Sequence, residues 1–361
     1  MTLWQRLTSI WRPGAYHHSP RQEMYFEGWY VKLVSPDLRQ RWAVIPGIFH
    51  HPDPDRSHAF IQVLNGVENT VDYHRFPTRT FQASRETFDV HLGDNRFWQE
   101  GCVLDLDGEG HHLQGELAFQ ECRPWPVRFT SPGVMGPYAF VPFMQTYHGV
   151  LSLNHALQGR LSIDGKEVDF SGGKGYMEKD WGTTFPRAYI WMQSNHFQRE
   201  GVCLTASAAT IPWLGSWFRG FLVGLWLEDR LYRFTTYLGS EIRSLRLTDE
   251  DVHWMLRGTQ RTAGDGFPGY ELEIRARRGE GGLLSSPELD GMTPRILESL
   301  TAEVEVTLRG LDREGGTTGI IFEGRGTCAG LEVAGSVQEI VEDDRGSRGS
   351  NQGQDVKNAG N

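Results

Sequence analysis

The chain has 361 residues with 36 basic and 46 acidic side chains, which gives a formal net charge of −10. The basic residues are dispersed, whereas nucleic acid binding requires a basic stripe, so nucleic acid is excluded as a partner. The four cysteines have no CxxC spacing, which excludes a zinc or redox motif. The length suggests two domains with enough apolar material to fold without disulfides or metal ions.

The start of the chain is predicted to form a short helix. Residues 2–11 place leucine and tryptophan at helical spacing before Pro13 and Gly14, so we assign a helical segment to residues 1–15. It is expected to cap a barrel end; the alternative is a peripheral contact of residues 2–11 with a membrane surface. No segment approaches the ~18 apolar residues of a membrane span, and an apolar signal-peptide core is lacking, so we expect a cytoplasmic protein.

From Tyr25 onward, short segments with period-two alternation follow one another between turn residues. Asp164-Gly165 predicts the turn of a hairpin that places Leu161 opposite Val168. We predict an all-β fold of two antiparallel units, barrels or sandwiches, packed together. The expected limits are residues 16–185 and 186–340 for the two units, one helical turn at 294–300, and a polar, disordered tail at 341–361.

The segment YFEGWYVKL places Glu27 and Trp29 on the same face of a strand, in an otherwise apolar row. If this row faces a barrel interior, desolvation should raise the pKa of Glu27 and make it a proton donor near neutral pH. The alternative is that Glu27 lies at the strand end and pairs with an arginine or caps a turn.

The segment RAYIWMQSNHF combines aromatic and amide side chains on one face of a predicted strand, which suits a pocket for a ring with polar substituents. The residues on this face are Tyr189, Trp191, Gln193, Asn195 and Phe197. The alternative is that Gln193 and Asn195 face water. His196 lies on the opposite face and is also a candidate for substrate binding.

His148 is predicted to lie before a strand, beside Gly149, where the loops of a barrel mouth would lie, and is the candidate proton acceptor. His155 shares a face with leucines and is expected to be a core residue. The histidine doublets point to opposite faces of an extended chain, so no metal site is predicted. No dinucleotide-binding or phosphate-binding motif occurs, and no cofactor is predicted.

The stretch GGKGYMEKDWGTTFP, residues 172–186, is the most concentrated set of polar groups, and its glycines predict an irregular connector between the two units. Alternation places Glu178 and Asp180 on one side and Lys179 on the other. Two carboxylates on one side repel, so one of them should keep its proton unless an arginine intervenes. The alternative is a salt-bridged junction that uses Lys179 and Arg187.

Four segments resemble the tocopherol cyclase family: YFEGWYVKL, PGVMGPYAFVPFMQTYHGVLSLNHALQGRL, GGKGYMEKDWGTTFPRAYIWMQSNHF and AGLEVAGS. The similarity extends from about Tyr16 to Gly335. The resemblance implies a lipocalin-like β fold, as in carotenoid hydratases and certain pericyclases. It also implies cofactor-independent closure of a prenylated hydroquinone to a chromanol. The lack of a plastid transit segment fits a bacterial-type member, and its substrate could be another prenylquinone or isoprenoid.

That chemistry requires an acid to protonate the alkene, aromatic faces beside the tertiary cation, and an acceptor for the phenol proton. The resemblance implies Glu178 or Glu27 as the acid. Asp180 stands where plant enzymes are expected to carry asparagine, which argues against it as the obligatory acid. The aromatic candidates are Trp29, Trp181 and Trp191, while Gln193 and Asn195 would hold the ring hydroxyls. Two alternatives stay open: an isoprenoid or lipid carrier, and an alkene hydratase.

Overall fold

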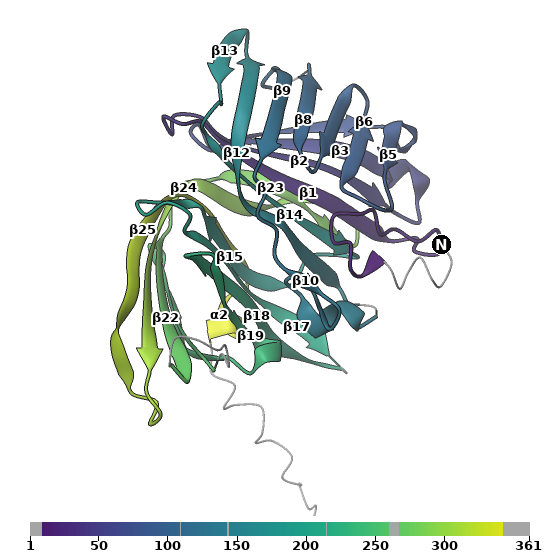
Figure 1. Ribbon diagram of the computed structural model, residues 1–361. Helices are drawn as coiled ribbons and strands as arrows, with labels where there is room; N and C mark the ends of the chain where they lie inside the picture. The colour runs from purple at the N-terminus through teal and green to yellow at the C-terminus, as the bar shows by residue number, and fades with distance from the viewer. Residues whose placement is uncertain (1–8, 109, 143, 214, 260–266, 342–361) are drawn as a thin grey trace, which may run out of the picture.

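The computed structural model describes residues 9–108, 110–142, 144–213, 215–259 and 267–341. Almost all regular structure in them is antiparallel β-strand, arranged in two large sheets that pack against each other (Figure 1). The prediction of an all-β fold with two packed antiparallel units is therefore confirmed. The predicted N-terminal helix and C-terminal tail fall mainly on residues 1–8 and 342–361, which lie outside the described residues.

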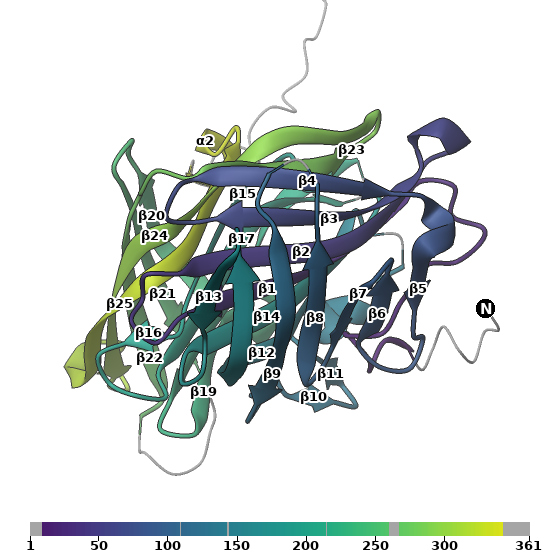
Figure 2. The same ribbon diagram turned by 90° about the horizontal axis from the view of Figure 1, so that it is seen from above.

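The first sheet has twelve strands from the N-terminal half of the chain. Along the sheet their order is β4 (Thr70–Phe76), β3 (His58–Asn65), β2 (Arg41–His50), β1 (Tyr25–Val34), β14 (Lys174–Gly182), β12 (Thr146–Ile163), β9 (Leu113–Gln120), β8 (Gly101–Leu106), β7 (Asn95–Trp98), β6 (Asp89–Leu92) and β5 (Phe81–Ala83), with β13 (Lys166–Asp169) beside β12. Strands β1 to β4 cross β8, β9 and β12 (Figure 2), and the apolar core of this unit contains side chains from both groups.

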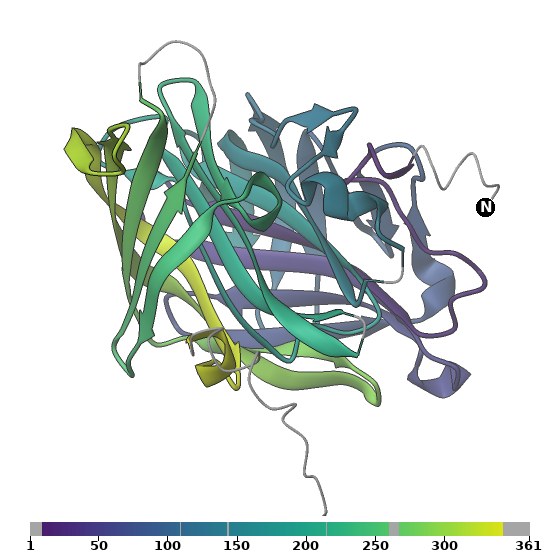
Figure 3. The ribbon, with the colours of Figure 1, turned by 90° about the horizontal axis from the view of Figure 1, so that it is seen from below.

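The second sheet has eleven strands from the C-terminal half. Their order is β19 (Arg230–Thr235), β18 (Ser216–Leu227), β17 (Cys203–Trp213), β15 (Ala188–Ser194), β25 (Thr317–Gly335), β24 (Gly291–Leu311), β22 (Gly269–Arg277), β21 (Asp251–Gly258) and β20 (Glu241–Leu247), with β16 (His196–Phe197) beside β25 and β23 (Gly282–Glu288) beside β24. This sheet curls around a core of its own (Figure 3).

The remaining elements are short. They are the strand pair β10 (Val127–Arg128) and β11 (Ser131–Pro132), the 3-10 turns η1 (Pro54–Arg56), η2 (Thr78–Thr80), η3 (Gly136–Phe140) and η4 (Thr236–Leu238), and the helix α2 (Gln338–Val341). Of the helices in the described part of the chain, none has the length and apolar character needed to cross a membrane.

Two local predictions have opposite outcomes. The hairpin at Asp164-Gly165 is confirmed, with Leu161 paired to Val168. The helical turn expected at residues 294–300 is wrong, because these residues belong to strand β24. Backbone pairing of β24 with β23 and β25 outweighs the local helical pattern.

The stretch expected to be an irregular connector is instead largely a central strand. Its residues 174–182 form β14, which pairs with β1 on one side and β12 on the other. Gly175 serves close packing rather than a loop, since a Cβ atom there would lie 2.0 Å from the His155 Nε2 atom. Residues 183–187 join the two sheets. The predicted boundary after residue 185 lies within them and stays a prediction.

Gly175→Ala should lower the free energy of unfolding by about 1–3 kcal/mol, because the added methyl group overpacks the buried His155 ring. Urea unfolding measures the change. Gly319→Ala is the matched control, since Gly319 also lies in a strand but has no atom within 4 Å of the added carbon. Equal effects of the two substitutions would contradict the packing argument.

A third apolar core joins the two sheets. It includes Tyr30 and Tyr176 from the first sheet and Tyr189 and Trp191 from the second. A two-point link lies beside it: the Gln62 side chain donates to the Ser285 carbonyl at 2.9 Å and accepts from the Ser285 amide at 2.8 Å. Side chains from both sheets therefore meet at this interface.

Candidate active site

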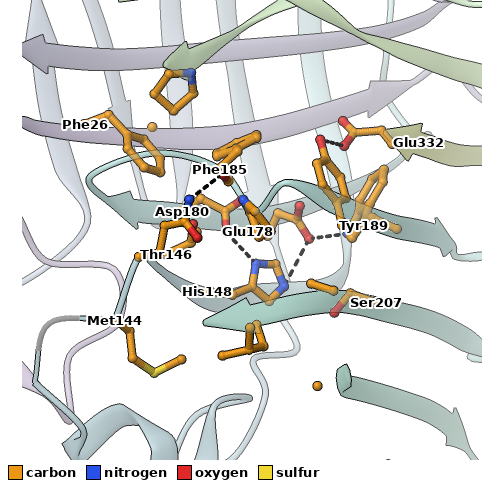
Figure 4. A pocket seen from close by; sticks show the side chains of 18 of the residues that line it. Phe26, Met144, Thr146, His148, Glu178, Asp180, Phe185, Tyr189, Ser207 and Glu332 are labelled. Atoms are coloured by element: carbon orange, nitrogen blue, oxygen red, sulfur yellow. Dashed lines mark hydrogen bonds and ion pairs between the residues drawn. The ribbon is translucent and has the colours of Figure 1, made fainter. Parts of the chain in front are cut away.

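A cavity of about 380 Å³ lies between the two sheets. Its wall is largely apolar and includes Phe26, Tyr138, Met144, Phe185, Trp213 and Phe218. Polar groups are few: from the first sheet they include His148, Glu178 and Asp180, and from the second Tyr189 and Glu332 (Figure 4). An apolar chamber with a small set of convergent polar groups is typical of a small-molecule site.

Strand alternation places Glu178 and Asp180 on one side of β14 and Lys179 on the other, as predicted, and the side with the two carboxyl groups faces the cavity. His148 lies opposite Asp180 on the neighbouring strand β12. His148 Nδ1 lies 2.9 Å from Asp180 Oδ1, and His148 Nε2 lies 3.6 Å from Glu178 Oε2. The sequence argument named an arginine as the cation that could relieve the repulsion between these two carboxylates. Among the ion pairs of the described residues, His148 is the partner of both.

His148 lies within strand β12, so its predicted position in a loop before the strand is wrong. Burial alone would lower the pKa of His148, but the carboxylates of Asp180 and Glu178 outweigh burial and raise it to about 9. At neutral pH the imidazole is therefore already protonated, so it cannot accept a proton as predicted. Its resting role is that of a cation beside two carboxyl groups.

Glu178 is buried and accepts hydrogen bonds on a single oxygen. Tyr176 Oη and Trp191 Nε1 donate to Glu178 Oε2 at 2.5 and 3.1 Å. Burial raises the pKa of Glu178, His148 lowers it, Asp180 raises it again, and the result is about 7. A carboxyl group with this pKa is about half protonated near neutral pH, which suits an acid catalyst.

Glu27 lies on the other face of the sheet, away from the cavity lining. Its carboxylate forms an ion pair with Lys179 and accepts hydrogen bonds from the Tyr25 hydroxyl and the His17 backbone amide. Burial raises the pKa of Glu27, but Lys179 and His17 outweigh it and hold the pKa at about 2. The expected raised pKa is therefore wrong, and the partner is a lysine rather than an arginine.

Trp29 and Trp181 accompany Lys179 on this opposite face. The Lys179 Nζ atom lies 4.8 Å from the ring centre of Trp29 and 4.5 Å from that of Trp181. Neither tryptophan lines the cavity. Trp181 lies two positions after Lys179 and so points to the same face of β14, and Trp29 is the cross-strand partner of Lys179. The cation that these rings face is the lysine.

The structure divides the candidate residues of β15 and β16. Tyr189 and Trp191 line the cavity, but Gln193, Asn195 and His196 lie beyond it. Gln193 Oε1 accepts from Lys32 Nζ at 2.7 Å, and Asn195 Nδ2 donates to the Gly175 carbonyl at 2.8 Å. Both amides are buried, so neither the pocket nor the water-facing interpretation holds. The pKa of His196 is lowered to about 3, mainly by burial.

Sequence reasoning missed Glu332, which lines the cavity from strand β25. Tyr189 Oη donates to Glu332 Oε2 at 2.6 Å. The available signal was the single acid in the segment AGLEVAGS, one of the segments that carry the family resemblance.

Within the described residues, His148, Glu178 and Asp180 form a group that could hold a metal ion, with one ligand atom from each lying within 4.8 Å of the others. A histidine ligand must be neutral. Without a metal, the carboxylates of Asp180 and Glu178 hold His148 as the imidazolium, so metal binding would have to displace that proton. The absence of a metal and of a cofactor stays a prediction.

Residues 95–335 match the protein family described as tocopherol cyclase-like. The chain is 22% identical over 377 residues to "Probable tocopherol cyclase, chloroplastic" of Oryza sativa subsp. japonica, covering 89% of this chain and 78% of the rice protein. It is also 22% identical over 378 residues to "Tocopherol cyclase, chloroplastic" of Zea mays, covering 89% and 77%. The fold is similar to that of CghA in complex with Sch210972, with a TM-score of 0.52, 13% identity, and coverage of 87% of this chain and 89% of CghA.

Proposed function

Because the chain belongs to the tocopherol cyclase-like family, we propose that it closes a prenylated hydroquinone or related quinol to a chromanol by acid catalysis, without a cofactor. The family supports an enzyme of the cyclase type. The observation that carries the specific reaction is Glu178, a carboxyl group with a pKa of about 7 that opens into an apolar, aromatic cavity. The proposed partner is therefore a hydrophobic small molecule.

In this proposal, Glu178 transfers its proton to the trisubstituted alkene, and the phenol oxygen captures the tertiary cation. The ring faces of Trp191 and Tyr189 in the cavity wall would stabilise that cation. The carboxylate left behind would be stabilised by the His148 cation and by the hydrogen bonds from Tyr176 and Trp191. Asp180 would keep His148 charged and oriented.

The direct test is incubation with a methylated prenyl hydroquinone in heavy water. The proposal expects a chromanol that carries one carbon-bound deuterium, because the proton on the alkene carbon comes from an exchangeable carboxyl group. Unchanged substrate at high enzyme concentration, across several prenyl quinols of different chain length, would refute the cyclase function.

The activity should fall as the pH rises through about 7, since the acid form of Glu178 is required and its pKa is about 7. Above that value, kcat/KM should drop about tenfold per pH unit. The substrate hydroxyl does not interfere, because phenols ionise near pH 10. A rate that stays flat between about pH 6 and 9 would contradict Glu178 as the acid.

The same cavity also suits two alternative functions. As a carrier of an isoprenoid or lipid, the protein would retain a hydrophobic ligand on purification, and Glu178→Gln would leave binding intact. As an alkene hydratase, it would deliver water instead of the phenol oxygen to the same cation. Mass spectrometry of the copurifying ligand and of the product separates these functions from cyclisation. The cytoplasmic location and the peripheral membrane contact of residues 2–11 stay predictions.

A further inference from the structure

A second pair of carboxyl groups lies at the cavity, contributed by the other sheet. Glu298 on β24 and Glu332 on β25 are direct cross-strand partners. Glu298 is fully buried, whereas Glu332 is partly exposed and reaches the cavity wall, where Figure 4 shows it beside Tyr189. The pair thus has an inner member and a member that faces the ligand space.

Each glutamate accepts a hydrogen bond from a tyrosine of the interface core. Tyr30 Oη donates to Glu298 Oε1, and Tyr189 Oη donates to Glu332 Oε2. The other oxygen of Glu298 is buried without a hydrogen-bond donor in the described part of the chain. The side chain of Glu332, the cross-strand partner of Glu298, interacts with that of Glu298. A proton between them would satisfy the orphaned oxygen.

The described residues provide no ion pair to either glutamate. The nearby buried amine is that of Lys32, whose Nζ atom donates hydrogen bonds to Gln193 Oε1 at 2.7 Å and to the Cys328 carbonyl at 2.6 Å. Two adjacent buried carboxylates without a bound cation repel strongly, and one shared proton removes that repulsion. Burial and the charge of Glu298 accordingly raise the pKa of Glu332, and burial raises that of Glu298.

We propose that Glu332, sharing a proton with Glu298, is a second catalytic residue of this site, and that it accepts the proton of the substrate hydroxyl. This inference rests on the proposed cyclisation and adds the base that the reaction requires. A carboxyl pair that holds one proton is suited to this work, because its inner member keeps the proton while the outer oxygen accepts another.

The proton balance of the reaction closes with two carboxyl groups. Glu178 loses its proton to the alkene carbon, where a C–H bond forms. The substrate oxygen forms the new C–O bond and loses its hydrogen to Glu332. When the product leaves, Glu332 returns one proton to solvent and Glu178 takes one up, so no net proton is consumed. Glu178 and Glu332 are placed for these roles because they line the same cavity from different sheets.

The decisive experiment compares Glu332→Gln with Glu178→Gln on three substrates. The first is a prenyl hydroquinone, the second its ring-fluorinated analogue with a more acidic hydroxyl, and the third an O-methylated analogue that cannot cyclise. Glu332→Gln should lower kcat about 100-fold on the first and about 10-fold or less on the second. It should still exchange deuterium into the third, whereas Glu178→Gln should lose that exchange.

Glu305→Gln is the matched control, because Glu305 is an exposed glutamate of the same strand as Glu298. It should leave all three assays unchanged. Equal losses for Glu332→Gln on the first two substrates would overturn the base assignment, as would wild-type kcat in that variant. If the wild-type protein forms no chromanol from any quinol, the proposed function fails, and the role of Glu332 fails with it.

The shared proton has a readout that does not depend on turnover. In a Glu178→Gln background, the infrared spectrum at neutral pH should show a protonated carboxyl stretch that shifts in heavy water. The band should change its frequency on adding Glu332→Gln or Glu298→Gln, because either change replaces the carboxyl partner of the remaining carboxyl group with an amide. A spectrum without this band in the Glu178→Gln protein would overturn the shared-proton pair.

Discussion

Replacing Glu178 with glutamine should lower kcat by about 10²–10⁴-fold, the range that a positioned general acid supplies. The amide keeps the size of the side chain and an oxygen acceptor for Tyr176 and Trp191, so the local hydrogen bonds persist. What it removes is the transferable proton. Substrate affinity should change little, because the apolar cavity wall that would hold the prenyl chain is untouched.

Single-turnover kinetics in heavy water measure this effect most directly, since they report the formation of the carbon-deuterium bond rather than product release. Glu167→Gln is the control, because Glu167 is an exposed glutamate of the same sheet. If Glu178→Gln kept more than about a tenth of the wild-type rate, the acid would have to be another group.

The alternation of the sequence predicted the fold class and the side of β14 on which Glu178 and Asp180 lie. Both follow from local rules, because side chains of a strand alternate regardless of what the strand packs against. The same rule placed Trp181 beside Lys179, and applying it consistently would have removed Trp181 from the candidate cavity residues.

The predictions that were wrong concern residues whose surroundings depend on contacts between distant segments. Glu27 was expected to titrate near neutral pH, but its partner Lys179 lies 152 positions away in the chain and reaches it only through the pairing of β1 with β14. Gln193 accepts a hydrogen bond from Lys32, which is also far from it in the sequence. Alternation predicts the face of a strand, but not which other segment covers that face.

Glu298 was missed for a related reason. Residues 294–300 have a local pattern that fits a helical turn, and a residue in a helical turn would have no cross-strand partner. Once β24 pairs with β25, Glu298 lies directly opposite Glu332, which lines the cavity. A carboxyl pair contributed by two strands has no signature in either strand alone.

Lys179→Met should lower the free energy of unfolding by about 3–5 kcal/mol, because it leaves the buried Glu27 carboxylate without its cation. Burial also lowers the pKa of Lys179 to about 8, so the ion pair offers little net gain over two neutral side chains. The loss arises from the isolated charge. Urea unfolding at neutral pH measures it, and the double variant Glu27→Gln/Lys179→Met should recover most of the lost stability.

The pH dependence gives this prediction a sign that can be checked. In the wild-type protein the pKa of Glu27 is lowered from 4.5 to about 2, so its contribution to stability is present above pH 4.5 and is lost as the pH falls toward 2. In Lys179→Met the pKa of Glu27 should rise, since only burial and weaker partners remain, and acid should neutralise the stranded carboxylate. The stability difference between the two proteins should therefore be largest near neutral pH and shrink on acidification. A difference that is independent of pH would mean that Lys179 contributes through its cation–π contacts with Trp29 and Trp181 rather than through its ion pair with Glu27.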